Sequence, residues 1–474
     1  MSMQLGIILI YILITVLIGI YAKKSSKTAS SFHGAGLGVL MCVAAGTGEW
    51  LGGTSTTGVS EYGFLYGFSG AWYTIANAIG IIFLAIFFAK LYRSLDTVTV
   101  PGIIERFIGK DARTVSSILL TFVMLAVGVS QMIAAGTLGV SVLGLNFDIS
   151  VIVFGICFII YTLFGGMTAV AYTNIMHLVM MYGGVILALF IATKDVGGVG
   201  GLLAALPAKP YASFFSIGPT RVSSWIIASI LGACTAQAGI QPILAAKDVN
   251  VAKKSAILTA VAVAPFGIFV ALLGMAAKVH FPDLANAKLA LPTLMMNMPP
   301  LAGGIVLAST MAAILSTMSP IILASGTMLT KDLYQKVIKP EATDQEVLKM
   351  SRITTAVSGV ICTVVAIAMY GTTRILDIVY FAYSIRGALF VVLLFGIYWV
   401  KTSQKGAIYG MICTAVVGIF WVVYSSIVGH YPIHPAISET YASVFTAAVA
   451  TYIFSLVFPN GDLVTTPQVK KSTS

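Results

Sequence analysis

The chain has 474 residues, of which 58% are hydrophobic and only 9% are charged. Soluble domains carry about 25% charged residues, so this composition excludes a soluble globular protein and indicates a helical integral membrane protein. The net charge of +11 does not indicate a nucleic-acid partner, because the basic residues gather in loops on one predicted side of the membrane. The five cysteines are scattered through apolar segments and predict neither a disulfide framework nor a metal site.

Long apolar segments predict about thirteen transmembrane helices. Their approximate ranges are 4–22, 37–63, 67–92, 114–143, 147–164, 167–194, 222–245, 256–279, 301–330, 353–371, 375–400, 407–428 and 440–457. The first segment is too long for a signal-peptide core and lacks a basic leader, so it is interpreted as a retained membrane helix. The polar tail after Pro459 is expected to be disordered.

The loops between these segments differ in their content of Lys and Arg. Twenty of the 27 basic residues fall on one side, six fall on the other, and Arg386 lies inside a predicted helix. The positive-inside rule therefore predicts an outer N-terminus and a cytoplasmic C-terminus. The inner segment 331–352 resembles a short amphipathic surface helix, with its acidic residues expected to be solvated.

The second apolar segment contains the stretch GTGEWLGGTSTTG, from Gly46 to Gly58. Five of its thirteen residues are glycine, and each costs a helix interior about 1 kcal/mol relative to alanine. Glu49 at membrane depth adds about 2.5–3.5 kcal/mol. Unwound backbone at this depth must be buried in protein or line a cavity, where its carbonyls can bind a cation. A kinked helix with glycines at a close crossing is the alternative.

A second segment, 222–245, is interrupted by Gly232, Gly239 and Pro242 around a polar centre. It begins five helices after the first and would run in the opposite direction, as inverted repeats require. The prediction is an N-terminal peripheral helix in 1–36, repeats over 37–194 and 222–400 joined by an outer loop at 195–221, and two peripheral helices with a tail in 401–474.

Hydroxyl side chains follow the apolar segment 301–334. The pair Ser316 and Thr317 lies beside Pro320, which frees a backbone carbonyl, and this pattern favours an oxygen-only site for a hard cation such as sodium. For Ser309 and Ser325 the favoured interpretation is an ordinary bond to a carbonyl one turn back.

Three stretches carry a resemblance to a known family: YTLFGGMTAVAYT at 161–173, GIQPILAAKDVNVAKK at 239–254 and AAILSTMSPIILASGTMLTKDLY at 312–334. Over nearly its whole length the chain resembles the sodium:solute symporter family. The resemblance implies the LeuT-type fold of five plus five helices in inverted repeats, with helices 2 and 7 broken. It also implies sodium as the coupling ion.

The resemblance further implies a sodium site made by the side chains of Ser316 and Thr317 and the carbonyls of Ala313, Thr47 and Trp50. Some relatives bind a second sodium through an aspartate and a hydroxyl, where this chain has Asn174 and Pro320. We therefore expect one sodium per cycle. His177, where relatives usually have glutamine, is interpreted as a buried neutral core residue rather than a proton relay.

The candidate solute-binding residues lie on the helices that line a central cavity in this fold: Glu49, Thr54, Gln131, Thr235, Gln237, Tyr383 and Arg386. An arginine at membrane depth suits a planar carboxylate. The predicted function is sodium-coupled import of a small organic solute bearing a carboxylate, such as a monocarboxylate, pantothenate or an amino acid.

Two alternatives remain open: proton coupling through Glu49, and a solute sensor that acts through a separate partner. Glu49 paired with Arg386, or Arg386 paired with Asp377, would instead be structural. No motif predicts an enzyme or a transition-metal site. The expected partners are the solute and the lipid bilayer, with no nucleic acid and no obligate protein partner. The expected location is a cell membrane, as in a bacterial inner membrane.

Overall fold

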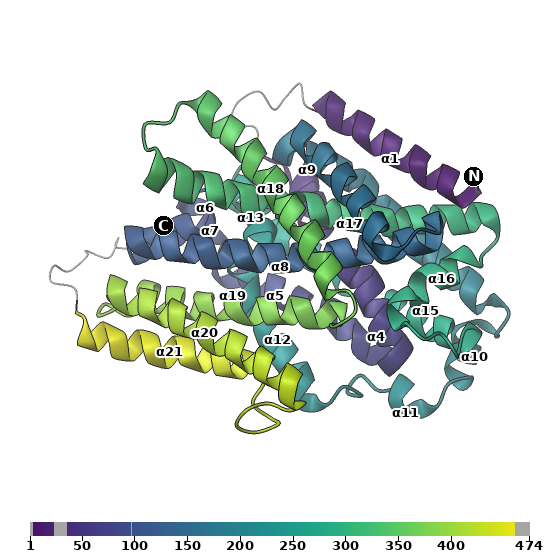
Figure 1. Ribbon diagram of the computed structural model, residues 1–474. Helices are drawn as coiled ribbons and strands as arrows, with labels where there is room; N and C mark the ends of the chain where they lie inside the picture. The colour runs from purple at the N-terminus through teal and green to yellow at the C-terminus, as the bar shows by residue number, and fades with distance from the viewer. Residues whose placement is uncertain (1–2, 23–35, 96, 460–474) are drawn as a thin grey trace.

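The computed structural model describes residues 3–22, 36–95 and 97–459 (Figure 1). Regular structure in these stretches is helical, apart from one isolated bridge between Leu37 and Ala246. Ten helical stretches of the described residues are long and apolar enough to cross a membrane. The all-α membrane fold is therefore confirmed. The predicted disordered tail and the first basic loop at 23–27 lie outside the described residues.

The helices are named by their labels in Figure 1. The first part of the chain forms α1 (Met3–Ala22), α3 (Val39–Trp50), η2 (Thr54–Gly58), α4 (Val59–Tyr66), η3 (Gly67–Ala71), α5 (Trp72–Phe87), α6 (Ala89–Ser94), α7 (Val100–Phe107), α8 (Lys110–Leu143), α9 (Phe147–Lys194), α10 (Gly198–Ala204) and α11 (Ala208–Tyr211). The second part forms α12 (Pro219–Ala233), α13 (Gln237–Ala245), α14 (Val249–Val263), α15 (Phe266–His280), η4 (Ala287–Leu289), α16 (Ala290–Met296), α17 (Pro300–Met328), η5 (Leu329–Ile338), α18 (Asp344–Met369), α19 (Ile375–Tyr398), α20 (Gln404–Val428) and α21 (Glu439–Val457). Helix occupies all thirteen predicted ranges.

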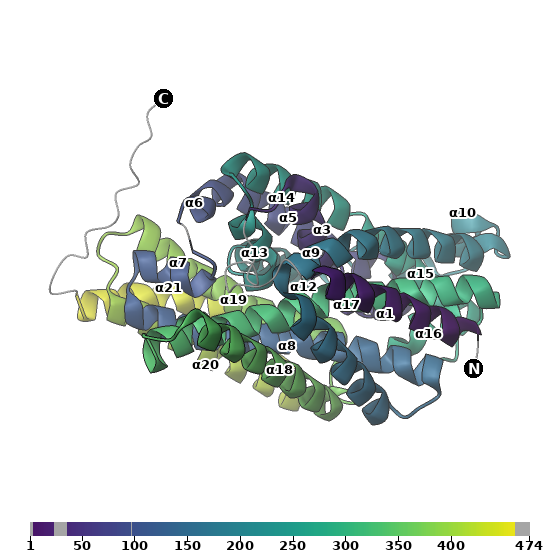
Figure 2. The ribbon, with the colours of Figure 1, turned by 90° about the horizontal axis from the view of Figure 1, so that it is seen from above.

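Two of the predicted helices, 147–164 and 167–194, are joined in the single element α9. The Tyr161 hydroxyl is hydrogen-bonded to Thr173 Oγ1. Twelve residues of straight helix would separate these two positions by about 18 Å, too far for a tyrosine side chain to reach. The element therefore folds back sharply between them, and Figure 2 shows both of its ends directed toward the same side of the molecule. Two spans are present, as predicted.

The first broken helix is interrupted after Trp50. Leu51 leaves the helix with φ −107° and ψ 73°, and the chain resumes as the wide turn η2 and then α4. Glycines are needed here because neighbouring helices approach the backbone. A Cβ on Gly53 would lie 2.5 Å from Ala134 Cβ, and one on Gly52 would lie 2.6 Å from Gln131 Oε1. Both predicted features, the break and the close packing, are present.

The second broken helix is interrupted at residues 234–236, between α12 and α13. The two broken helices touch at one end of the molecule, where the Leu37 amide donates to the Ala245 carbonyl (2.9 Å) and the Lys247 amide to the Leu37 carbonyl (3.0 Å). Beside them runs α17, the most buried of the candidate spans: 94% of its apolar window lies inside the protein.

The remaining helices surround this core. α1 packs on α9 and α17, while α20 and α21 pair with each other and contact α19 (Figures 1 and 2). Only 22% of the α20 window and 33% of the α18 and α21 windows are buried. These outer helices expose long aliphatic side chains, as expected where a helix meets lipid.

The prediction for segment 331–352 holds in part: Glu341 and Asp344 are exposed and Glu346 is partly exposed. It is wrong for the separate helix and for Asp332. The chain does not form a separate surface helix there, because α17 continues through η5 to Ile338 and α18 already begins at Asp344. Asp332 is fully buried rather than solvated. Its carboxylate is paired with Arg113, a partner more than two hundred residues away that local sequence reasoning does not identify.

Candidate functional site

The Ser316–Thr317 pair of α17 faces the end of α3. Ser316 Oγ lies 3.1 Å from the Gly48 carbonyl, 3.5 Å from the Leu51 carbonyl and 2.8 Å from the Ala313 carbonyl. Thr317 Oγ1 lies 2.5 Å from the same Gly48 oxygen. Both side chains are buried. The structure thus brings two hydroxyls and three carbonyls together.

The break in the helix explains why these carbonyls are available. The last carbonyls of a helix have no intrahelical donor and carry the negative end of its dipole. The Thr47 carbonyl still accepts from the Leu51 amide, at 2.9 Å. The oxygens at the hydroxyl pair are therefore those of Gly48 and Leu51, each one residue after the Thr47 and Trp50 carbonyls that the resemblance implied. Unwound carbonyls at the end of a half-helix suit a sodium ion.

A second set of polar groups lies next to this cluster. Asn174 Nδ2 is 3.4 Å from the Ser316 carbonyl, and the hydroxyl of Thr162 donates to Ser319 Oγ at 3.0 Å. Ser319 accepts this hydrogen bond, and the next residue is Pro320, which has no hydroxyl. The expectation of a single sodium per cycle stays a prediction.

Glu49 and Arg386 are the charged groups at the centre. Both are buried, at 7% and 1% exposure, and neither forms an ion pair with another described residue. Glu49 Oε2 and the Nε and Nη2 atoms of Arg386 have no hydrogen-bond partner within the described chain. A direct Glu49–Arg386 salt bridge is therefore not formed, and Asp377 pairs with Arg221 instead.

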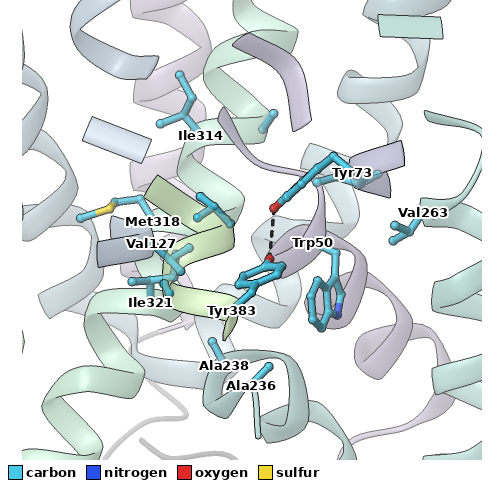
Figure 3. Close-up of a cluster of buried hydrophobic side chains, with 14 of the residues drawn as sticks. Trp50, Tyr73, Val127, Ala236, Ala238, Val263, Ile314, Met318, Ile321 and Tyr383 are labelled. Carbon is cyan, nitrogen blue, oxygen red and sulfur yellow. Dashed lines mark hydrogen bonds between the residues drawn. The ribbon is translucent and has the colours of Figure 1, made fainter. Parts of the chain in front are cut away.

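Aromatic rings hold the arginine in place. The Arg386 guanidinium lies over the Tyr383 ring, 3.4 Å from its centroid, and 5.3 Å from the Trp50 ring. Figure 3 shows Tyr383 beside Trp50 and below Tyr73, with the two tyrosine hydroxyls 3.2 Å apart. Cation–π contact stabilises a desolvated guanidinium, and it leaves Nε and Nη2 of Arg386 without a hydrogen-bond partner among the described residues.

Four of the other candidates are occupied by contacts within the protein. Gln131 Oε1 accepts from the Gly53 amide at 2.6 Å, and its Nε2 donates to Thr54 Oγ1 at 2.7 Å. Thr235 Oγ1 donates to the Arg386 carbonyl at 2.5 Å. Gln237 bonds the Val100 amide (2.7 Å) and the Val98 carbonyl (3.0 Å). These side chains hold the two helix breaks in position. Of the seven candidate solute-binding residues, the remaining three, Glu49, Tyr383 and Arg386, lie together in the central region.

Sequence reasoning missed two residues of α5 near this region. Tyr73 is hydrogen-bonded to Tyr383. Asn77 follows one turn later and is fully buried, with both amide atoms lacking a partner among the described residues. The signal was present in the sequence, because a tyrosine and an asparagine four residues apart lie on one face of a helix.

One end of the central region is closed by contacts between α4, α12 and α19. The Tyr62 hydroxyl donates to Asp377 at 2.6 Å, and Asp377 is paired with Arg221. Trp225 and Tyr380 are stacked, with centroids 4.2 Å apart and planes 8° apart. We call this set the outer contact, since the distribution of basic residues predicts that this end faces outward. Trp225 thus joins α12 to α19 at the outer contact.

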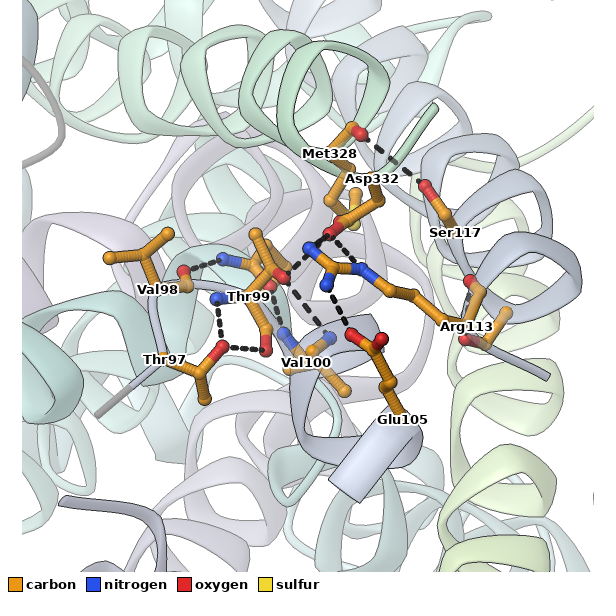
Figure 4. Close-up of polar contacts among 12 residues, drawn as sticks. Thr97, Val98, Thr99, Val100, Glu105, Arg113, Ser117, Met328 and Asp332 are labelled. Carbon is orange, nitrogen blue, oxygen red and sulfur yellow. Dashed lines mark hydrogen bonds and ion pairs between the residues drawn. The ribbon is translucent and has the colours of Figure 1, made fainter. Parts of the chain in front are cut away.

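The opposite end is held by a polar network, which Figure 4 shows. Arg113 of α8 is paired with both Asp332 and Glu105, and Thr99 Oγ1 donates to Asp332 at 3.0 Å. Gln237 joins the same segment through Val98 and Val100. We call this set the inner contact. It links α7, α8, α13 and η5.

His177 is fully buried, and its Nδ1 is hydrogen-bonded to the Tyr11 hydroxyl of α1. The aromatic residues Tyr66 and Trp72 make local contacts: Tyr66 lies under Arg374 (5.4 Å), and Trp72 Nε1 donates to the Phe214 carbonyl (2.8 Å). Both contacts lie near the outer contact rather than across the central region.

The chain is similar to known transporters. The model of the sodium:solute symporter family matches residues 32–414. A sodium/glucose cotransporter of Vibrio parahaemolyticus is 24% identical, over 77% of this chain and 73% of that protein. The high-affinity proline transporter PutP of Bacillus subtilis (strain 168) is 26% identical, over 92% of this chain and 95% of that protein.

Solved structures with the same fold include a substrate-bound, outward-open Na+-coupled sialic acid symporter. Its TM-score is 0.81 at 17% identity, covering 98% of this chain and 100% of that one. MhsT in complex with L-phenylalanine has a TM-score of 0.59 at 14% identity, covering 89% of this chain and 99% of that one. These likenesses confirm the predicted LeuT-type fold.

Proposed function

Because the chain belongs to the sodium:solute symporter family, we propose that it imports a small carboxylate-bearing solute together with sodium. Membership of this family makes the protein a multi-pass membrane transporter with sodium as its coupling ion. Beyond this, we propose the chemical class of the solute and the residues that bind the ion. We also propose an outer N-terminus, a cytoplasmic C-terminus and a bacterial inner membrane as its location.

Sodium is proposed to bind between α3 and α17. Its ligands would be the hydroxyls of Ser316 and Thr317 and the carbonyls of Ala313, Gly48 and Leu51, which already converge there. All five are uncharged oxygens on two different elements. An ion at this position would bind the broken helix to α17 only when both are correctly placed, so it would favour one conformation over others.

The observation that supports a carboxylate is Arg386. Its guanidinium is buried, lies on two aromatic rings, and has two nitrogen atoms without a hydrogen-bond partner among the described residues. A planar carboxylate can satisfy such a fork with two parallel hydrogen bonds. Glu49, whose Oε2 is also unpartnered, would bind an ammonium or hydroxyl group of the same solute.

Coupling follows from the shared use of α3. The Gly48 and Leu51 carbonyls are at the proposed ion site, and Glu49 and Trp50 between them face the proposed solute site. Ion and solute would therefore select the same position of this segment. By thermodynamic linkage, each would raise the affinity for the other by the same factor.

Proton coupling through Glu49 remains the second candidate, because this buried carboxylate makes no ion pair within the described chain. The two candidates predict different effects of the substitution Glu49→Gln. If sodium is the coupling ion, the variant retains sodium-dependent stabilisation. If the proton is the coupling ion, uptake by the variant loses its dependence on pH.

The first experiment measures thermal stability of the purified protein in sodium or potassium at equal ionic strength, with carboxylates, amino acids, sugars and nucleobases added. The proposal expects a sodium-specific rise in Tm that one carboxylate-bearing solute increases. An equal Tm in both salts, with a solute effect that follows pH, would overturn sodium coupling. A response to an uncharged sugar alone would overturn the carboxylate.

A further inference from the structure

A cavity of about 810 Å³ lies beside the first half of α19, next to the outer contact. Its walls come from α8, α12, α18 and α20 as well as α19. Pockets for organic ligands measure roughly 300–1,000 Å³, so this cavity is large enough for one. The proposed transport mechanism does not use it.

Most of the wall is apolar and continuous with the outer surface of the helix bundle. The apolar side chains of the wall include Phe122, Leu125, Val129, Ile361, Val365 and Phe381. Phe122 and Ile361 are 44% and 39% exposed, on helices whose surfaces are predicted to face lipid. A hydrocarbon chain can therefore reach the cavity from the bilayer without crossing water.

The end of the cavity near the outer contact is charged. Arg221 and Asp377 line it but are paired with each other. Arg374 and Glu439 also line it, and neither forms an ion pair with another described residue. Arg374 precedes α19 and lies over the Tyr62 and Tyr66 rings, while Glu439 is the first residue of α21. Neutral groups engage both side chains, since Arg374 is hydrogen-bonded to Tyr62 and Glu439 to Tyr431. One positive and one negative charge thus lack an ion-pair partner among the described residues.

We propose that this cavity binds one zwitterionic phospholipid. An acyl chain lies along the apolar wall, the phosphate lies at Arg374, and the headgroup ammonium lies at Glu439. A phospholipid fits because its headgroup carries both signs of charge at one end of a long hydrocarbon chain. The cavity likewise has charges of both signs at one end of an apolar wall. A purely anionic headgroup would leave Glu439 without an ion-pair partner, and a free phosphate would leave the apolar wall empty.

The site has a consequence for the outer contact. The cavity is lined by Asp377, Tyr380 and Trp225, the residues that join α19 to α4 and α12. A lipid packed behind α19 supports these contacts and favours the closed outer end. By linkage, conditions that open the outer end weaken lipid binding.

The test uses the purified, delipidated full chain. Native mass spectrometry counts bound dilauroyl-phosphatidylethanolamine, and its titration in mixed micelles gives an apparent affinity. Three changes address the two parts of the site: Ala126→Trp fills the apolar wall, where Ala126 is only partly buried, and Arg374→Gln and Glu439→Gln remove the charges. Matched controls are Ala448→Trp on α21 and Lys194→Gln at the end of α9, which do not line the cavity.

We expect one phosphatidylethanolamine per wild-type chain, at least tenfold weaker binding in each of the three site variants, and wild-type binding in both controls. Phosphatidylglycerol is expected to bind at least tenfold more weakly than phosphatidylethanolamine. Equal affinity for the two lipids, or unchanged binding in Ala126→Trp, would overturn the proposal. Equal binding of glycerophosphoethanolamine, which lacks the acyl chains, would show a headgroup site only and would also overturn it.

Discussion

At the scale of single residues, the hydroxyls of α17 divide into two groups with different partners. Ser316 and Thr317 reach carbonyls on α3, whereas Ser325 donates to the Ile321 carbonyl of its own helix at 3.0 Å. Replacing Ser316 and Thr317 together by alanine should reduce sodium affinity at least tenfold and abolish the sodium-specific rise in Tm. Ser325→Ala, the same change on the same helix, should retain that rise. Sodium stabilisation that survives the double substitution would contradict the proposed ligands.

Arg386 allows a second prediction at this scale. Arg386→Lys keeps the positive charge but loses the planar fork that can bind both oxygens of a carboxylate. We expect solute affinity to fall about 10- to 100-fold, since each 1.4 kcal/mol changes an affinity tenfold. Sodium-induced stabilisation in the absence of solute should be unchanged, and it serves as the internal control. Wild-type solute affinity in this variant would exclude bidentate binding.

At the scale of elements, the break between α3 and α4 depends on backbone that neighbouring side chains touch directly. A Cβ on Gly53 would lie 2.5 Å from Ala134 Cβ, and overpacking of this kind costs about 1–3 kcal/mol. Gly53→Ala should therefore lower Tm and weaken sodium binding together. Gly183→Ala, in the middle of α9 with no atom within 4 Å of the added Cβ, should be neutral or slightly stabilising. Similar losses of stability in both variants would contradict this account.

At the scale of the whole molecule, the outer and inner contacts close opposite ends of one central region. Asp377→Asn removes the charge that pairs with Arg221, and Asp332→Asn removes the charge that pairs with Arg113. Each should shift the population toward the state that is open at its own end. Hydrogen exchange should rise in peptides of α4 for the first variant and in peptides covering residues 97–107 for the second. A rise at both ends in either variant would indicate general destabilisation instead.

Much of this architecture was predictable because the bilayer constrains a chain so strongly. Apolar runs must become helices at membrane depth, and so helix occupies all thirteen predicted ranges. The glycines and the buried charge around Glu49 were equally informative, since such a stretch is tolerated only where the helix breaks. The Ser316–Thr317 pair could be identified beside Pro320 because its local pattern is unusual for a membrane helix.

Contacts between elements far apart in the chain could not be predicted from local sequence patterns. Gln131 and Gln237 were predicted to face the solute, but they hold backbone at the two breaks. Asp332 was predicted to be solvated, yet it is buried against Arg113. The carbonyls at the hydroxyl pair belong to Gly48 and Leu51 because the exact residue at which α3 ends sets which oxygens are free.

The sequence by itself thus determined the class of protein, the positions of the membrane helices and the two places where helices break, because each follows from local chemistry in a membrane. Only the tertiary structure decided which polar groups pair with one another and which remain unpartnered at the centre. The physical reason is that a buried polar atom must find a partner somewhere in the fold, and that partner usually lies far away along the chain.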